Sequence, residues 1–132
     1  MAISDPIADM LTRIRNAVRN RSKTVTCLNT KVCRGILDVL KSEGYIDLYD
    51  VVEDGRQGLL KVKLRFGPSG SPVLRKLHRE SKPGCRVYCR AEEAPSPQQG
   101  LGISIVSTSQ GVKSNRSCAA EKVGGELLCT IE

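Results

Sequence analysis

Apolar residues recur every three or four positions in two early stretches of the chain, which places them on one face of a helix. The first stretch begins at Ser4-Asp5-Pro6, where a capping side chain precedes a proline in the first helical turn. The second follows Asn29-Thr30, covers about residues 31–42 and meets Gly44, which is suited to a left-handed helix end. The predicted buried positions are Ile7, Met10, Leu11, Ile14 and Val18 in the first helix, and Val32, Ile36, Leu37 and Leu40 in the second.

Three further stretches of the first half have the shorter spacing of strands. They cover residues 23–28, 45–52 and 59–66, and the last alternates apolar residues with Lys61, Lys63 and Arg65, as in a sheet covered on one side. Helix, strand, helix, strand and strand form a small α+β unit. The run Gly67-Pro-Ser-Gly-Ser-Pro72 follows it, so we predict an N-terminal domain over residues 1–66 and a C-terminal domain over 67–132.

The second half has the pattern of a mainly β unit. Its predicted elements are strands over residues 73–78, 85–90 and 126–131, a turn at Ser81-Lys-Pro-Gly84 and a loop over 92–99. Ser114 is suited to cap one short helix, which runs to about Lys122 and ends at Gly124-Gly125. The whole chain is therefore predicted to be α+β, with the N-terminal unit packed against a mainly β C-terminal unit that has one short helix.

The most unusual stretch of the chain follows a Gly100-Leu-Gly102 entry. Residues 103–106 are mostly apolar and predict a strand, after which Ser107, Thr108 and Ser109 place three hydroxyls in a row before a predicted turn. One interpretation is a strand end with a polar turn. The other is an uncharged polar surface that contacts bases or sugars, while basic residues elsewhere hold phosphates.

A second candidate surface lies on the predicted strand over residues 85–90. Alternation places Arg86, Tyr88 and Arg90 on one side of this strand. An aromatic ring between two guanidinium groups suits stacking on nucleic acid or binding beside it. The alternative is a tyrosine packed by its cross-strand neighbours.

The charge of the chain favours a polyanionic partner. Its 21 Lys and Arg residues outnumber its 14 Asp and Glu residues, which gives a formal charge of +7. No acid occurs between Asp9 and Asp38, a stretch in which Arg15 and Arg19 lie on the outer face of the first predicted helix. That face either binds phosphates or is merely solvated, and the missing acids favour the first interpretation.

Other classes of function have little support in the sequence. We find no P-loop, no dinucleotide motif and one histidine, His78, without a motif around it, so we predict no enzymatic activity and no cofactor. The six cysteines lack the paired CxxC spacing of zinc knuckles, which predicts free, mostly buried thiols and no metal site. Without an apolar run of membrane-spanning length or a recognisable signal peptide, we expect a cytoplasmic protein.

Several motifs together resemble one family, the eighth protein ("S-eight") of the small ribosomal subunit in its bacterial and organellar form. They extend over nearly the whole chain and are Asp5-Pro-Ile-Ala-Asp-Met-Leu-Thr-Arg-Ile-Arg-Asn-Ala17, Ser81-Lys-Pro-Gly84 with Arg86-Val-Tyr88, Gly100-Leu-Gly102, Ser107-Thr-Ser109 with Gly111-Val112, and Gly124-Gly-Glu126 with Leu128-Cys129. The resemblance implies a two-part fold that binds an irregular helical stem in the central domain of small-subunit ribosomal RNA. It further implies an early role in subunit assembly.

The resemblance also implies further partners. Neighbouring small-subunit ribosomal proteins are expected, the fifth protein ("S-five") among them. In many bacteria, proteins of this family repress their own operon by binding a similar stem in messenger RNA. The rival classes are an unrelated basic protein-interaction module and a thiol-dependent enzyme.

The family's RNA-binding surface falls on two motifs and one tyrosine of this sequence. Together with the basic residues of the charge pattern, the predicted RNA-binding residues are Ser107, Thr108, Ser109, Tyr88, Gly124, Gly125, Glu126, Arg86, Arg15 and Arg19. An irregular stem displaces bases that an A-form groove would hide, so hydroxyls and a tyrosine ring have groups to bind. For Glu126 two roles stay open, acceptance of a hydrogen bond from base amino groups and bracing of the turn.

The chain departs from the family pattern at a few positions. Lys113 stands where relatives usually have an apolar residue, often Met, and is therefore a further candidate for a phosphate contact. Ser114-Asn115 replaces a Thr-Asp pair, and Thr130-Ile-Glu132 replaces an aromatic end. None of these changes falls on the Ser-Thr-Ser or Gly-Gly-Glu motif.

Overall fold

A computed structural model describes residues 5–53, 55–56, 58–68, 70–95 and 102–132 of the chain. The contacts divide the chain into two compact units, the first unit Met1–Arg75 and the second unit Lys76–Glu132. The chain has helices and antiparallel sheets, which confirms the predicted α+β class. Residues 67–75 belong to the first unit by these contacts, and the domain boundary at Gly67 stays a prediction.

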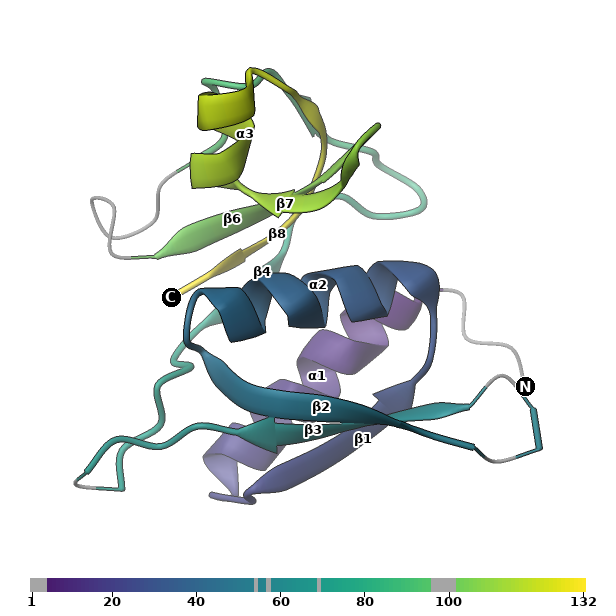
Figure 1. Cartoon of the computed structure of the whole chain (residues 1–132), viewed down its shortest axis with the longest axis vertical. Helices are drawn as coiled ribbons and strands as arrows, with labels where there is room; N and C mark the ends of the chain where they lie inside the picture. The colour runs from purple at the N-terminus through teal and green to yellow at the C-terminus, as the bar shows by residue number, and fades with distance from the viewer. Residues whose placement is uncertain (1–4, 54, 57, 69, 96–101) are drawn as a thin grey trace. The chain divides into compact units, whose positions relative to one another are not determined.

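The first unit has two helices on one face of a three-stranded antiparallel sheet (Figure 1). Its elements are α1 (Pro6–Arg19), β1 (Thr24–Leu28), α2 (Lys31–Ser42), β2 (Ile46–Val52) and β3 (Leu59–Leu64). The strands lie in the order β1-β3-β2, so β3 pairs with both neighbours. Leu60, Val62 and Leu64 of β3 are buried, whereas Lys61 and Lys63 are exposed. The predicted succession of elements and the one-sided sheet are confirmed.

Each helix of the first unit begins at a side-chain cap. The Asp5 carboxylate accepts a hydrogen bond from Ala8 N, and the Thr30 hydroxyl accepts one from Cys33 N at 3.1 Å. Ser4, the other candidate cap, lies outside the described residues. Gly44 follows α2 with a φ of 84°, the left-handed conformation that its position predicted.

The buried face of α1 differs from the prediction at one position, and that of α2 differs at two, since Val39 is also buried there. Ala17 is buried and Val18 only half-buried, because Ala17 lies seven residues after Met10 and three after Ile14, on the centre of the buried stripe. Cys33 is buried in place of Val32, since it lies three residues before Ile36 and four before Leu37. The small side chains of Ala17 and Cys33 leave room for close packing.

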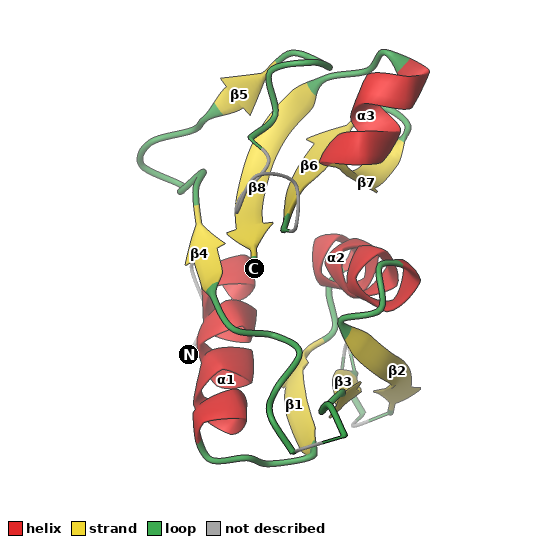
Figure 2. Ribbon diagram, turned by 90° about the vertical axis from the view of Figure 1, so that its left-hand side faces the viewer, coloured by secondary structure: helices red, strands yellow, loops and turns green. Residues whose placement is uncertain are grey.

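The second unit is a five-stranded antiparallel sheet with one short helix (Figure 2). Its elements are β4 (Leu77–Arg79), β5 (Tyr88–Cys89), β6 (Ile103–Thr108), β7 (Gly111–Ser114), α3 (Asn115–Glu121) and β8 (Gly125–Ile131). The order is β4-β8-β6-β7, and β5 pairs with β8 as well. β4 and β5 therefore pair with different parts of β8. β8 also pairs with β6, so it contacts three of the other four strands of the sheet.

Several boundaries in the second unit differ from the prediction. The strands predicted over 73–78 and 85–90 are reduced to Leu77–Arg79 and Tyr88–Cys89, because the paired register with β8 includes only these residues. The strand β7 was not predicted. α3 is capped by Ser114 and extends to about Lys122, as predicted, but the residue that ends it in the left-handed conformation is Lys122, with a φ of 55°, and not Gly124-Gly125. The predicted turn at residues 81–84 is present, and residues 96–99 of the predicted loop lie outside the described residues.

Removal of the α2 cap tests this account of the first unit. Thr30→Ala deletes the hydroxyl that accepts from Cys33 N, so we expect the free energy of unfolding to fall by about 1 kcal/mol in denaturant titrations. Thr30→Ser keeps the hydroxyl and is expected to keep most of the stability. An equal loss in both variants would show that the methyl group, and not the cap, stabilises the helix.

Candidate nucleic-acid interface

Three of the predicted RNA-binding residues lie in one row across three paired strands. Tyr88 of β5 is the register partner of Glu126 of β8, and Glu126 is the register partner of Ser107 of β6. Directly opposite residues of antiparallel strands project from the same face of a sheet. The register therefore places the phenol, the carboxylate and the hydroxyl side by side on one face, which we call the polar row.

The polar row lies on the face of the sheet opposite its small apolar cluster. Val106, Leu127 and Cys118 form this cluster, and Val87 and Cys89 pack against it. These strand residues alternate with Ser107, Glu126 and Tyr88, so the two sets project from opposite faces. Tyr88 is accordingly 70% exposed. The predicted alternation of residues 86–90 is confirmed, although Cys85 is exposed and does not join the buried side.

The three hydroxyls of the Ser-Thr-Ser motif have different roles. Thr108 Oγ1 donates to the Gly111 carbonyl oxygen at 2.7 Å and accepts from Gln110 N at 3.1 Å, so it closes the turn between β6 and β7. Ser107 is half-buried and Ser109 is exposed, and neither hydroxyl is hydrogen-bonded to another described residue. The first and third hydroxyls are therefore available to a ligand, while the second holds the turn.

Gly124 and Gly125 let the strands around the polar row approach closely. A Cβ atom at Gly125 would collide with the carbonyl oxygen of Ser107, and one at Gly124 would lie 2.6 Å from the Cys89 carbonyl oxygen. A side chain therefore fits at neither position. These glycines are thus required by backbone packing, and their place beside Ser107 and β5 explains why a glycine pair precedes Glu126.

Glu126 is braced by two donors from other parts of the second unit. Its Oε2 accepts a hydrogen bond from Ser81 Oγ at 2.5 Å and one from Arg86 Nη1 at 2.9 Å. Ser81 is fully buried, and its Oγ also accepts from Val87 N at 3.1 Å. These contacts join Glu126 to Ser81 and Arg86, and both roles considered for its carboxylate, binding of base amino groups and bracing of the turn, stay predictions.

The same contacts determine the acidity of Glu126. Burial raises its pKa, but the hydrogen bonds from Ser81 and Arg86 and the positive charges of Arg86 and Arg79 outweigh burial and lower the pKa below the ordinary value of 4.5. The side chain is therefore charged at neutral pH. The ion pair between Glu126 and Arg86 leaves less positive charge beside the row than the sequence suggests, because Arg86 is partly neutralised.

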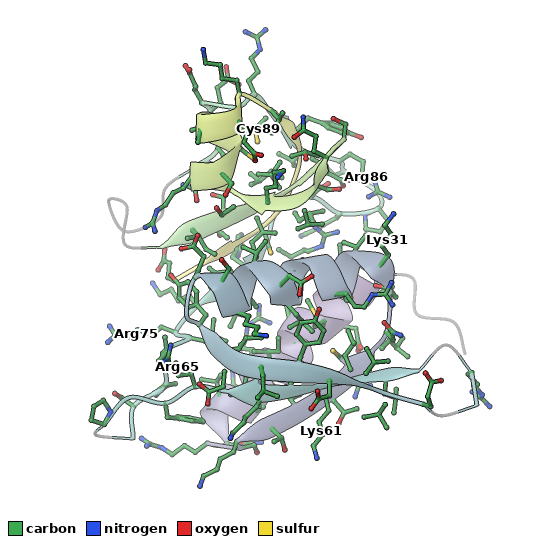
Figure 3. The ribbon with its side chains drawn as sticks, in the orientation of Figure 1. Lys31, Lys61, Arg65, Arg75, Arg86 and Cys89 are labelled. Carbon is green, nitrogen blue, oxygen red and sulfur yellow. The ribbon has the colours of Figure 1, made fainter. Side chains whose placement is uncertain are left out.

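The remaining basic residues are spread over both units. Arg86, which is labelled in Figure 3, lies two residues before β5 and is half-exposed, and Arg90 is exposed. Arg15 and Arg19 lie on α1 of the first unit, with Arg19 exposed and Arg15 half-buried. Lys113 is paired with Glu121 at 2.8 Å, so it supports α3 in the structure and its phosphate contact stays a prediction.

Ser81 is the residue of this site that sequence reasoning missed. It stands in the Ser81-Lys-Pro-Gly84 motif, which predicted a turn and gave no reason to expect a buried hydroxyl. In the structure its backbone N donates to the Leu127 carbonyl oxygen at 3.1 Å, and its hydroxyl joins Glu126 to Val87. A serine directly ahead of a tight turn was the only signal available.

The cysteines are free thiols in the structure. Cys27, Cys33, Cys118 and Cys129 are buried, Cys89 is half-buried and Cys85 is exposed, which confirms mostly buried thiols. Burial raises the pKa of Cys27 and of Cys129 to about 12, so both are protonated at neutral pH. Among the described residues, no three His, Cys, Asp or Glu side chains are grouped closely enough to hold a metal ion. In the same part of the chain, no helix is both long and apolar enough to cross a membrane.

Comparisons with known proteins identify the class and then the family. The chain is 46% identical over 129 residues to a protein of Finegoldia magna, with 98% of each chain covered. It is 47% identical to a protein of Heliobacterium modesticaldum and 44% identical to one of Clostridioides difficile, each over 131 residues and 99% of both chains. All three relatives are named "Small ribosomal subunit protein uS8".

These relatives define the class: the chain is a protein of the small ribosomal subunit, and not an enzyme. The family model described as "Ribosomal protein S8" matches residues 5–131, and the chain belongs to this family. The resemblance predicted from the sequence motifs is thereby confirmed. As a component of the small subunit, the protein works in the ribosome, in the cytoplasm.

The close strand approach at Gly125 predicts a strong effect of one methyl group. Gly125→Ala forces β8 away from Ser107, so we expect a loss of about 1–3 kcal/mol in the free energy of unfolding. Gly84→Ala is the matched control, since a Cβ there meets nothing within 4 Å. Stability of Gly125→Ala equal to that of the control would contradict the close approach.

The bracing of Glu126 predicts a pH dependence of stability. A carboxyl group whose pKa is lower in the folded state stabilises the fold fully above its unfolded pKa, near 4.5, and loses this contribution as the pH falls through the folded pKa. We therefore expect the stability difference between wild type and Glu126→Gln to be largest above pH 4.5 and to shrink in acid. Urea unfolding across a pH series measures it. A constant difference across the series would refute the role of the charge.

Proposed function

We propose that the polar row and the adjoining turn bind an irregular helical stem of small-subunit ribosomal RNA. Membership in the ribosomal protein S8 family supports RNA as the ligand. The observation that carries the assignment to this surface is the register of Tyr88, Glu126 and Ser107, which gathers an exposed ring and a hydroxyl on one open sheet face. Ser109 adds a second hydroxyl, which is exposed, at the turn.

The chemistry of the surface suits displaced bases better than a regular duplex. A hydroxyl both donates and accepts, so Ser107 and Ser109 match base edges or 2′-hydroxyl groups of several kinds. The exposed Tyr88 ring offers a stacking platform, which needs an unstacked base. Neither feature gains from the uniform phosphate surface of an A-form stem. The site therefore favours a stem with an irregular core.

Basic residues supply the part of the affinity that does not depend on sequence. Arg86 is fixed by Glu126 at 2.9 Å, so it presents its remaining donors in a defined direction beside Tyr88. Arg15 and Arg19 contribute phosphate contacts from the first unit. These contacts raise affinity for any RNA and make it depend on salt, while the hydroxyls and the ring discriminate among stems.

Binding of this stem supports assembly of the small subunit, with neighbouring small-subunit proteins, S-five among them, as further partners. A similar stem in the protein's own messenger RNA is a second ligand, since a surface that reads shape and displaced bases binds both RNAs alike. The same Ser107 and Tyr88 contacts serve both. Repression of the operon would then follow from competition between the two RNAs.

Paired variants on the two kinds of contact test this function. Ser107→Ala/Ser109→Ala is expected to cost about 1–3 kcal/mol per lost contact on an irregular ribosomal stem and little on a regular duplex. Arg15→Ala/Arg19→Ala is expected to weaken binding to both RNAs and to reduce the slope of affinity against salt concentration. Affinity measured across a salt series separates the two effects. If only the arginine substitutions lower the affinity, the polar row supports the fold and does not bind RNA.

A further inference from the structure

Exposed aliphatic side chains are concentrated on β2 of the first unit. Among the described residues, four large hydrophobic side chains are exposed, and three of them are Leu48, Val51 and Val52, at 41%, 47% and 42% exposure. The fourth is Tyr88, which belongs to the polar row. Leu48 and Val52 project from one face of the strand, whereas Val51 lies on the other face with Leu60. Exposed aliphatic groups that share one face are a feature of surfaces that bind another protein.

β2 is also an edge strand. The order β1-β3-β2 places it at one margin of the sheet, and β3 is its only strand partner among the described residues. The other edge of β2 therefore offers backbone N–H and C=O groups for pairing with an extended segment. Addition of a strand to such an edge is a common mode of peptide recognition.

The register of β2 defines what an added strand would meet. Leu48, Asp50 and Val52 are the register partners of Lys63, Lys61 and Leu59 of β3. They share the face of Lys61, which points away from α1 and α2 (Figure 3). A strand paired with β2 would place its own residues i, i+2 and i+4 directly opposite Leu48, Asp50 and Val52. Side chains that complement these three residues are apolar at i, basic at i+2 and apolar at i+4.

We infer that β2 binds an extended segment of another protein with an apolar-x-basic-x-apolar pattern. The apolar residues pack on Leu48 and Val52, and the basic residue pairs with Asp50, as opposite charges on neighbouring strands attract. This surface lies in the first unit and uses none of the residues assigned to RNA. The inference therefore stands apart from the proposed RNA binding.

A second copy of this chain and RNA are the two other candidate occupants of this edge, and both fit it less well. A second copy paired through β2 with Leu48 and Val52 in contact would set Asp50 opposite Asp50, in parallel or antiparallel orientation, and like charges directly opposite each other are unfavourable. RNA would meet the Asp50 carboxylate at the open edge of β2, where it repels phosphates, although Lys61 and Lys63 of β3 share this face. Binding of the ribosomal stem to β2 is therefore one outcome of the test. A basic extended segment is the occupant that satisfies both the charge and the apolar groups.

A charge-reversal experiment on the full chain tests the inference. The probe is the capped peptide Thr-Val-Thr-Lys-Thr-Val-Thr, and its matched control has Glu in place of Lys. Titration into isotope-labelled protein, followed by amide chemical shifts, should give shifts centred on residues 46–52. We expect about two- to tenfold weaker binding of the Glu peptide, and Asp50→Lys should reverse this preference.

One further double variant tests the apolar contacts. Leu48→Thr/Val52→Thr removes the apolar contacts at exposed positions, so the fold should persist while both peptides bind more weakly. The inference is overturned if the shifts fall outside β2, or if Asp50→Lys leaves the preference unchanged. It is also overturned if the ribosomal stem shifts the β2 amides, or if the protein dimerises through β2 at the concentrations used.

Discussion

The carboxylate of Glu126 holds together three separate parts of the second unit. It joins β8 to Ser81, which follows β4, and to Arg86, which precedes β5. The buried Ser81 hydroxyl extends the contact to Val87 N, so the chain entering β5 is fixed on both sides of Arg86. β5 has only two residues and little pairing of its own. Its position beside β8, and with it the place of Tyr88 in the polar row, depends on this carboxylate.

The absence of side chains at Gly124 and Gly125 also fixes the neighbours of β8, because it allows the strands to approach closely. β8 approaches the Ser107 carbonyl and the Cys89 carbonyl so closely that no Cβ fits, and this brings Tyr88 and Ser107 to either side of one residue. A carboxylate at the centre of the proposed RNA-binding surface is compatible with this function, because its charge is paired with Arg86. In the proposal, the hydroxyls and the aromatic ring of this surface supply the specific contacts, and arginines outside the row supply the attraction to phosphates.

The first unit was predicted well because its signals are local. Helical spacing, the Thr30 cap and the alternation of β3 act over a few residues, and all three appear in the structure. The second unit depends on pairing with β8, so strand lengths near Leu77 and Tyr88 could not be read from their own sequence. The motif residues were recognised, but their roles required tertiary contacts. Thr108 closes a turn and Ser81 supports Glu126, and the periodicity of apolar residues in the sequence indicates neither role.

Contact between the polar row and RNA is measured by intermolecular nuclear Overhauser effects between labelled protein and an unlabelled irregular ribosomal stem. We expect contacts to RNA protons from the Tyr88 ring and from the β protons of Ser107 and Ser109. Contacts confined to α1 or to the face that carries α3, with none from Tyr88 or Ser107, would contradict this expectation.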